Sequence, residues 1–317
     1  MRSLAVMALL AVLAGLVGCK TLGFGGGNRD GLASRSGNSP VVLARGGGGF
    51  QDMSITAGGM QRSYFLYVPA SSTGALVVAF HGGGQDAERF IQGVGLKDMA
   101  DRYGFVMAVP VGVRETWNNG SIDPQGYAED HGIDDLSFVA ALVDEVLASG
   151  VARADRVYAM GVSMGGMMTY NAACNLPGRF AAIAVVAGTL SSGRCADAAG
   201  ISLLHIHGTE DERIPFEGGQ GEFTASDQVW TSARQGILTF ADAAQCSPNW
   251  QSRQITADTT CTVTACQGSD AVEYCLVQGG GHTWPGVATT KRQKRQGASS
   301  TSTFNATDAI AAFFQQH

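Results

Sequence analysis

The sequence predicts an α/β fold with a mostly parallel central sheet, helices on both of its faces and an antiparallel hairpin at its start. Two observations predict this fold class. Short apolar runs of strand length alternate with longer stretches in which apolar residues recur at helical spacing, which is typical of strands joined by right-handed helical crossovers. Ahead of them, residues 53–69 hold two alternating runs around Ala57-Gly58-Gly59, a sequence suited to a hairpin turn.

The elements after the hairpin follow from composition and periodicity. Compact apolar runs predict buried strands at 75–80, 105–112, 156–161, 181–188, 201–208 and 271–277. Helices are predicted at 90–104, 134–149, 163–174, 229–244 and 305–316. Asp134 or Asp135 can cap the second helix, and Asn305 or Thr307 the last. In such sheets, sites form in loops at the carboxyl ends of strands, so polar residues that follow a strand are the candidates for chemistry.

The first residues resemble an export signal. Arg2 precedes a short apolar run and small residues, a layout that predicts a signal peptide over 1–18 rather than a spanning helix. Residues 16–19, Leu-Val-Gly-Cys, resemble the bacterial lipobox, which implies cleavage before Cys19 and a lipid on its thiol. Ordinary cleavage nearby without a lipid is the alternative. Lys20 resembles the residue that follows the cysteine in lipoproteins sent to an outer membrane. We therefore expect an exported protein, periplasmic or extracellular, held to the membrane by this anchor.

Residues 19–49 are rich in glycine, serine and asparagine and hold few large apolar residues. Such a segment cannot bury enough apolar surface to fold, so it is predicted to be a flexible tether. Residues 50–317 are long enough for one sizeable domain. The formal net charge of −6 argues against nucleic acid as a partner. We expect a monomer.

Six cysteines follow Cys19, and an even number in an exported chain predicts disulfides. Residues 259–277 read as two β-rich runs joined near 267–270, which would place Cys261 opposite Cys275 across a hairpin, within bridging distance. The simplest remaining pairs are then Cys246–Cys266 and Cys174–Cys195.

Ser163 lies in Gly161-Val162-Ser163-Met164-Gly165, a G-x-S-x-G pattern between a predicted strand and a predicted helix. A sharp turn there would lift the hydroxyl out of the sheet, and its neighbours must be small for steric reasons. The following helix would present its amino-terminal dipole to the reacting oxygen. The pattern predicts a nucleophile, and a plain packing turn is the alternative.

A serine nucleophile needs a base within hydrogen-bond reach. His282 follows a predicted strand near the end of the chain, where the order Ser…Asp/Glu…His of the α/β-hydrolase fold places the base. The acid must follow a strand between Ser163 and His282. Asp211 is the predicted acid and Glu210 is the alternative; the acid would hold the imidazole tautomer without taking the proton.

His205 and His207 lie two apart on a predicted strand and could be read as a metal pair. The sequence shows no third ligand at suitable spacing, so structural roles are predicted for both. We expect neither a metal nor an organic cofactor.

The loop after the strand at 75–80 reads His-Gly-Gly-Gly-Gln, which resembles the loop that supplies one oxyanion donor in many esterases. Gly83 is the preferred donor, although Gly82 and Gly84 remain open, and the amide of Met164 is the predicted second donor. Trp117 and its neighbour Asn118 follow a strand, and Trp284 lies two residues past His282. These loop positions predict walls of the substrate pocket, with burial in the core as the alternative for both tryptophans.

These motifs together resemble the polyhydroxybutyrate depolymerase-like esterases, a family that includes feruloyl and acetylxylan esterases. In order, the motifs are HGGGQ, GFVMAVPVG, TWNNG, DDLSFVAALVDEV, RVYAMGVSMGGMM, HIHGTED and GGGHTWPG. The resemblance runs from the opening hairpin nearly to the end of the chain. It implies an α/β-hydrolase fold and the triad Ser163, Asp211 and His282. The cysteines at 174, 195, 246 and 266 also resemble family positions, which supports the pairs proposed above.

The resemblance implies a serine ester hydrolase that acts on hydroxyalkanoate oligomers or on feruloyl or acetyl sugar esters through an acyl-enzyme. A predicted anchor, and the lack of a second polymer-gripping domain after the catalytic part, favour soluble oligomers over crystalline polymer. Two alternatives remain: a peptidase or thioesterase with the same triad, and a lipid-tethered binding protein that keeps the scaffold without turnover.

Overall fold

A computed structural model of the chain describes most of the predicted domain. The residues described are 48–124, 126–195, 198–224, 228–268, 270–289, 294 and 303–317. The predicted signal peptide, Cys19 and nearly all of the predicted tether lie outside them. Within these ranges, no helix is both long enough and apolar enough to cross a membrane.

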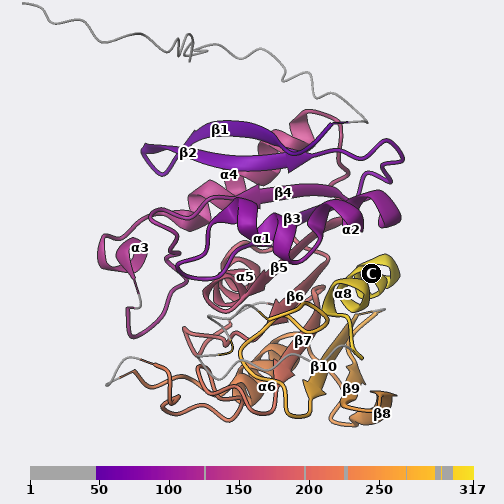
Figure 1. The fold of residues 1–317 in the computed structure, drawn as a ribbon. Helices are drawn as coiled ribbons and strands as arrows, with labels where there is room; N and C mark the ends of the chain where they lie inside the picture. The colour runs from indigo at the N-terminus through magenta and orange to yellow at the C-terminus, as the bar shows by residue number, and fades with distance from the viewer. Residues whose placement is uncertain are drawn as a thin grey trace, which may run out of the picture. The chain divides into compact units, whose positions relative to one another are not determined.

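The described strands form one ten-stranded sheet in the order β1-β2-β4-β3-β5-β6-β7-β10-β9-β8 (Figure 1). The strands are β1 (Gln51–Ala57), β2 (Met60–Tyr67), β3 (Leu76–Phe80), β4 (Val106–Pro110), β5 (Val157–Val162), β6 (Ala182–Val186), β7 (Ser202–Gly208), β8 (Gln251–Thr256), β9 (Thr259–Ala265) and β10 (Ala271–Val277). The six strands from β4 to β10 along the sheet pair in parallel, whereas β1 and β2 at one edge and β8 and β9 at the other pair antiparallel. The predicted parallel sheet with an opening hairpin is confirmed.

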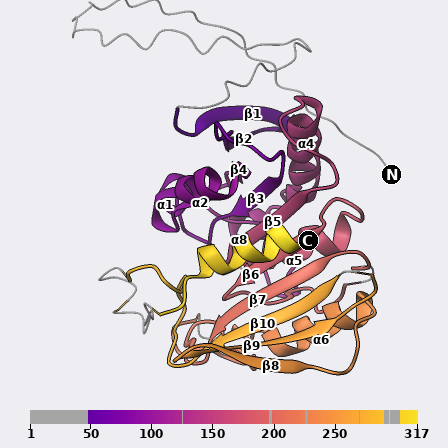
Figure 2. The same ribbon diagram turned by 90° about the vertical axis from the view of Figure 1, so that its right-hand side faces the viewer.

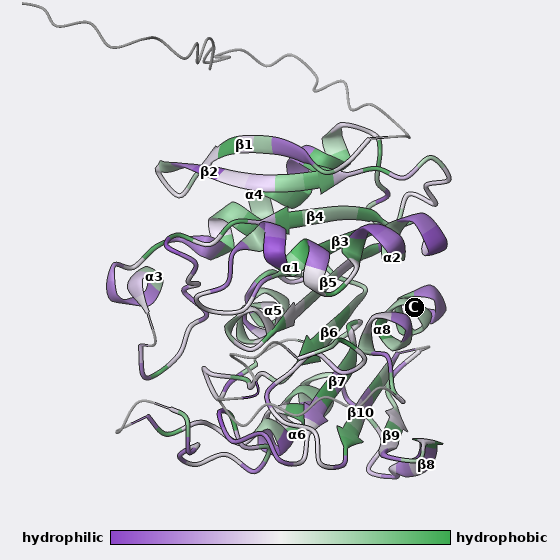
Figure 3. Cartoon of the chain, in the orientation of Figure 1, coloured by the Kyte–Doolittle hydropathy of each residue, from purple (hydrophilic) through white to green (hydrophobic). Residues whose placement is uncertain are grey.

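Helices cover both faces of this sheet (Figure 2). They are α1 (Ala87–Gly93), α2 (Leu96–Tyr103), α3 (Tyr127–Asp130), α4 (Asp135–Ala148), α5 (Met164–Asn175), α6 (Ala233–Ala243) and α8 (Ala306–Gln316). One buried apolar cluster joins α4, α5 and α6 to one face, and a second joins α1, α2 and α8 to the other. Because both faces are covered, strands such as β3 and β4 are buried along their whole length and are strongly apolar (Figure 3).

Four elements differ from the sequence prediction, one of them the short helix α3, which was not predicted. The helix expected at 90–104 is two helices, because Gly95 adopts a left-handed conformation with φ of 70° and separates α1 from α2. The helix expected from 229 begins at Ala233, where the Ser232 hydroxyl accepts the amide of Gln235 as a cap. Strand β8 was not predicted, since its sequence is polar and exposed and carries no apolar alternation.

Three disulfides, Cys174–Cys195, Cys246–Cys266 and Cys261–Cys275, join the predicted pairs. Cys261 and Cys275 are directly opposed in the antiparallel register of β9 and β10, as the hairpin argument requires. Cys174 lies on α5, so its bridge to the segment after β6 ties the helix that follows Ser163 to a neighbouring loop.

Candidate active site

Ser163 lies on a strained turn between β5 and α5. Its φ of 56° and ψ of −125° are rare for a residue with a side chain, and such strain persists only where the surroundings enforce it. Here the surroundings are backbone. A Cβ atom on Gly161 would lie 2.3 Å from the carbonyl oxygen of Gly165, and one on Gly165 would lie 2.3 Å from that of Phe80. Both glycines of the motif are therefore required by the close approach of the main chain.

The Ser163 hydroxyl meets the imidazole of His282, which follows β10. The distance from His282 Nε2 to Ser163 Oγ is 2.9 Å. On the other side of the ring, His282 Nδ1 lies 2.9 Å from Asp211 Oδ2 and 3.2 Å from Oδ1. Three side chains far apart in the sequence thus form one continuous row of hydrogen bonds. Glu210, the alternative acid, is exposed and its side chain takes no part in this row.

Asp211 is buried and accepts hydrogen bonds on both carboxylate oxygens. Its Oδ1 accepts the amides of Arg213 and Ile214 at 3.0 and 2.8 Å. Burial alone would raise the pKa of this carboxyl, but the charge of His282 and hydrogen bonds from His207 and His282 hold the pKa of Asp211 well below its usual range. The lowered pKa favours the ionised carboxylate, which can orient His282 and stabilise its cation.

The glycine loop after β3 leaves one of its three candidate amides free. The amide of Gly82 donates to Gln85 Oε1 at 3.0 Å, and that of Gly84 donates to the Glu115 carbonyl at 2.8 Å. The amide of Gly83 has no acceptor in the described part of the chain. Gly83 also lies against Met164, because a Cβ on it would be 3.4 Å from Met164 Cβ.

Met164 supplies a second free amide beside Ser163. As the first residue of α5, it belongs to the turn whose N–H groups have no intrahelical acceptor. The Ser163 amide is occupied by the Val186 carbonyl at 2.9 Å, so it does not compete for an anion. The two free main-chain amides therefore belong to Met164, the residue after Ser163, and to Gly83, which lies against Met164.

His81 holds the glycine loop in shape. Its Nδ1 lies 2.9 Å from the Gly82 carbonyl, which can only accept, so Nδ1 carries the proton. Its Nε2 then accepts the amide of Gly112 at 3.0 Å. Burial lowers the pKa of His81, which agrees with a neutral ring that bridges two loops. The Trp117 indole donates to the His81 carbonyl at 2.9 Å and closes the same junction.

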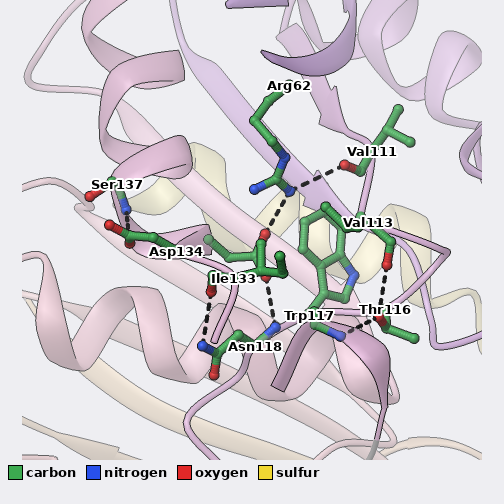
Figure 4. Close-up of polar contacts among 12 residues, drawn as sticks. Arg62, Val111, Val113, Thr116, Trp117, Asn118, Ile133, Asp134 and Ser137 are labelled. Atoms are coloured by element: carbon green, nitrogen blue, oxygen red, sulfur yellow. Dashed lines mark hydrogen bonds and ion pairs between the residues drawn. The ribbon is translucent and has the colours of Figure 1, made fainter. Parts of the chain in front are cut away.

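A buried ion pair supports the segment that carries Trp117 (Figure 4). Arg62 Nη2 lies 2.6 Å from Asp135 Oδ1, and both side chains are buried. The second oxygen of Asp135 accepts the amide of Asn118 at 2.7 Å, and the Asn118 side chain donates to the Ile133 carbonyl at 2.9 Å. The ion pair thus fixes the backbone directly after Trp117.

Trp117 and Trp284, predicted as pocket walls with burial in the core as the alternative, lie in the core, whereas Asn118 is half-buried and its pocket role stays a prediction. Trp117 is fully buried, and Trp284 is 5% exposed with its indole donating to Thr307 Oγ1 at 3.0 Å. Each buried indole N–H needs an acceptor, and both acceptors lie inside the protein. The Asn118 amide group is likewise engaged by the backbone.

The neighbouring Asn119 was overlooked by the sequence prediction. It is 1% exposed, and neither its amide nitrogen nor its oxygen has a hydrogen-bond partner among the described residues. Asn118 and Asn119 are adjacent in TWNNG, and the sequence contains no signal for which of the two side chains is hydrogen-bonded to the protein.

Comparison with known proteins places this chain in a family. The model of the esterase PHB depolymerase family matches residues 62–209. The esterase NocK of Nocardia uniformis subsp. tsuyamanensis is 31% identical over 253 residues, which cover 73% of each chain. The chain belongs to the PHB depolymerase family of esterases. It is accordingly a carboxylic ester hydrolase.

The feruloyl esterases among the relatives of this PHB depolymerase-family esterase match less of their own length. Feruloyl esterase B of Piromyces equi is 28% identical over 176 residues, 52% of this chain and 32% of that protein. Among solved structures, the acetyl xylan esterase of Aspergillus awamori aligns with a TM-score of 0.56 at 15% identity, over 78% of this chain and 98% of that one. This likeness shows the α/β-hydrolase fold, as the sequence predicted.

Proposed function

We propose that this esterase cleaves its substrate through a covalent acyl-enzyme on Ser163. The observation that carries the proposal is the row of hydrogen bonds from Ser163 Oγ through His282 to Asp211. His282 Nε2 takes the hydroxyl proton as Ser163 Oγ attacks the ester carbonyl, and later returns it to the leaving alcohol. Asp211 keeps the other imidazole proton on Nδ1. Water then attacks the acyl-enzyme by the same route and releases the acid.

The free amides of Gly83 and Met164 act as the oxyanion donors in this proposal. The negative charge forms on the carbonyl oxygen of the tetrahedral intermediate, and preorganised N–H groups stabilise it at no reorganisation cost. Occupation of the Gly82 and Gly84 amides favours Gly83 among the three glycines. Loss of one such donor typically costs about 2.7–4 kcal/mol of transition-state stabilisation.

The substrates proposed are hydroxyalkanoate oligomers and feruloyl or acetyl esters of sugars. Relatives named as feruloyl esterases and a structural neighbour named as an acetyl xylan esterase support this range. Three disulfides agree with export to an oxidising compartment. We retain as proposals the lipid on Cys19, the tether over 19–49 and the catalytic domain over 50–317.

The test uses the full mature chain, a small activated ester and a fluorescent organophosphate. We expect the wild type to hydrolyse the ester and to be labelled by the probe, and the Ser163→Ala variant to do neither. Equal hydrolysis by both proteins, with no labelling of the wild type, contradicts the proposal. A panel of a hydroxybutyrate oligomer, a feruloyl ester, an acetylated sugar and a peptide amide then ranks the substrate classes, and fastest cleavage of the amide makes the protein a peptidase.

A further inference from the structure

A buried chain of polar side chains runs beneath the site and is not used by the chemistry above. Tyr170 on α5 has its Oη 3.0 Å from His205 Nδ1. His205 Nε2 lies 3.0 Å from His207 Nδ1, and both histidines are on β7. His207 Nε2 lies 2.8 Å from the Ile214 carbonyl and 3.4 Å from Asp211 Oδ2. All three polar side chains are at most 1% exposed.

The direction of every hydrogen bond in this chain follows from one acceptor. The Ile214 carbonyl has no proton to give, so His207 Nε2 carries the N–H. In the neutral ring, His207 Nδ1 then accepts the N–H of His205 Nε2. His205 Nδ1 in turn accepts the hydroxyl proton of Tyr170. Each donor therefore points toward the loop after β7 that carries Asp211.

The reverse arrangement leaves a buried group unsatisfied. A doubly protonated His207 would donate from Nδ1 to His205, and His205 would donate to Tyr170 Oη. The Tyr170 hydroxyl proton would then have no acceptor, since its oxygen meets only His205 among the described residues. An unpaired buried hydroxyl is destabilising, which disfavours this arrangement. Burial also lowers the pKa of His205 well below its ordinary value, in keeping with a neutral ring.

The last ring of the chain also lies against the oxygen of Asp211 that accepts the hydrogen bond from His282 Nδ1. Asp211 Oδ2 faces two titratable groups, His282 Nδ1 at 2.9 Å and His207 Nε2 at 3.4 Å. Tyr170 lies two turns along the helix that begins after Ser163. A closed ring therefore joins the serine, the imidazole, the carboxylate, the two buried histidines and the tyrosine, and the helix returns it to the serine.

We infer that His207 is a positioning residue for Asp211. Tyr170 and His205 set the tautomer of His207, and their hydrogen bonds connect the helix after Ser163 to the loop that carries Asp211. The inference rests on the proposed function. A role in packing alone would not need polar atoms at this position. Phe216 already packs against the His207 ring, with 5.5 Å between the ring centroids. An apolar side chain in place of His207 would avoid the cost of desolvating polar atoms.

Two substitutions of nearly equal size separate these roles. Glutamine can place its amide nitrogen where His207 Nε2 lies, whereas the shorter asparagine reaches only the Nδ1 position. We expect His207→Gln to keep kcat within about threefold of the wild type. His207→Asn should lower kcat by roughly tenfold with KM unchanged, which corresponds to the loss of one hydrogen bond. With one donor fewer, Asp211 becomes more basic, so the acidic limb of the kcat/KM profile should move up by about half a pH unit.

Tyr170→Phe tests the far end of the chain, because it frees His205 Nδ1 from its donor. We expect a fall in kcat of about threefold. Tyr158→Phe makes the same chemical change in the other core cluster and should leave kcat unchanged. Equal activities of His207→Asn and His207→Gln, or an unmoved acidic limb, overturn the inference. Absence of Ser163-dependent hydrolysis in the wild type overturns the proposed function instead.

A spectroscopic readout does not depend on turnover. In Ser163→Ala labelled with ¹⁵N-histidine, the ring nitrogens of His205 and His207 should both report a protonated Nε2 and an unprotonated Nδ1. Protonation of Nδ1 in either ring overturns the inference whatever the activity of the wild type.

Discussion

The groups on the two sides of Ser163 differ in kind: side chains on one side and main-chain amides on the other. On the acid side, the row from Ser163 to Asp211 is made by side chains: His282 meets Ser163, and Asp211 meets His282. On the proposed oxyanion side, the free donors are the main-chain amides of Gly83 and Met164, and no side-chain atom of either residue is a donor. The acid side therefore depends on which residue is present, whereas the oxyanion side depends on the shape of a loop.

This difference decides where each side can fail. An acid-to-amide substitution removes the charge on the acid side and still leaves an oxygen to accept the amides of Arg213 and Ile214. The glycine loop is held from outside by His81, by the indole of Trp117 and, one step further, by the pair Arg62–Asp135. We expect substitutions on the acid side to lower kcat alone, and those behind the oxyanion loop to lower stability and kcat together.

The largest effect is expected for Asp211→Asn. The amide cannot accept as a charged group and can leave His282 in the wrong tautomer, so kcat should fall by about 10⁴ with KM nearly unchanged. Glu210→Gln is the matched control, since it makes the same chemical change on the exposed neighbour. Steady-state kinetics on an activated ester measure both. Equal losses in the two variants would contradict the assignment of Asp211 as the acid.

The convergence of Ser163, His282 and Asp211 was predictable because the roles proposed for them call for particular residue types in a fixed chain order. Ser163, Asp211 and His282 each follow a strand, and only a few residues of the right chemistry compete for each role. Parallel pairing of β5, β7 and β10 brings the loops after these strands to one edge of the sheet. The hydrophobic pattern that predicts the strands therefore also predicts that these residues meet.

The oxyanion side was predictable only to the level of a loop. Which glycine has a free amide depends on Gln85 and on the carbonyl of Glu115, and neither contact is encoded in the spacing of the glycines. The inward orientation of Trp117 likewise depends on an acceptor, the His81 carbonyl, that lies 36 residues away. Long-range partners for main-chain groups have no periodicity in the sequence, and so the tryptophan was assigned to the pocket.

Arg62→Leu should break the support behind the oxyanion loop. It leaves the Asp135 carboxyl buried with no opposite charge beside it. Burial raises the pKa of this carboxyl even with Arg62 present. Loss of one partner of a buried pair typically costs about 3–5 kcal/mol. Denaturant unfolding should show this loss, and kcat should fall with it. Arg102→Leu breaks the exposed pair with Asp308 and should cost at most about 1 kcal/mol. Similar losses of stability in both variants would show that the buried ion pair does not support the glycine loop.

Trp117→Phe should have a smaller effect on the same loop. The ring is kept, but the His81 carbonyl loses its indole donor and is left buried, at a cost of about 1–3 kcal/mol in the free energy of unfolding. Because the glycine loop starts at His81, kcat should fall as well. Trp250→Phe makes the same change near the far edge of the sheet, beside Tyr274, and should leave kcat unchanged. An unchanged kcat in Trp117→Phe would show that the loop keeps its shape without this bond.

The smallest expected effect is on the pH dependence of stability. It is tested with one buried histidine on each side of the site: His81 behind the glycine loop and His205 beneath Asp211. Burial lowers the pKa of His81, and lowers that of His205 well below its ordinary value. Above the unfolded pKa of about 6.5 the stability is complete; as pH falls below it, the unfolded chain binds protons that the folded chain does not, so the free energy of unfolding declines. Each group contributes at most about 1.4 kcal/mol per pH unit.

Denaturant unfolding between pH 5 and pH 7 should therefore show a slope that His205→Gln reduces more than His81→Gln does. Asp211 does not enter this window, because its depressed pKa removes stability only at pH values below about 4. His131→Gln, at an exposed position, should leave the slope as it is in the wild type. If all three variants keep the wild-type slope, neither ring is held neutral by burial, and the fixed tautomers on both sides of Ser163 lose their physical basis.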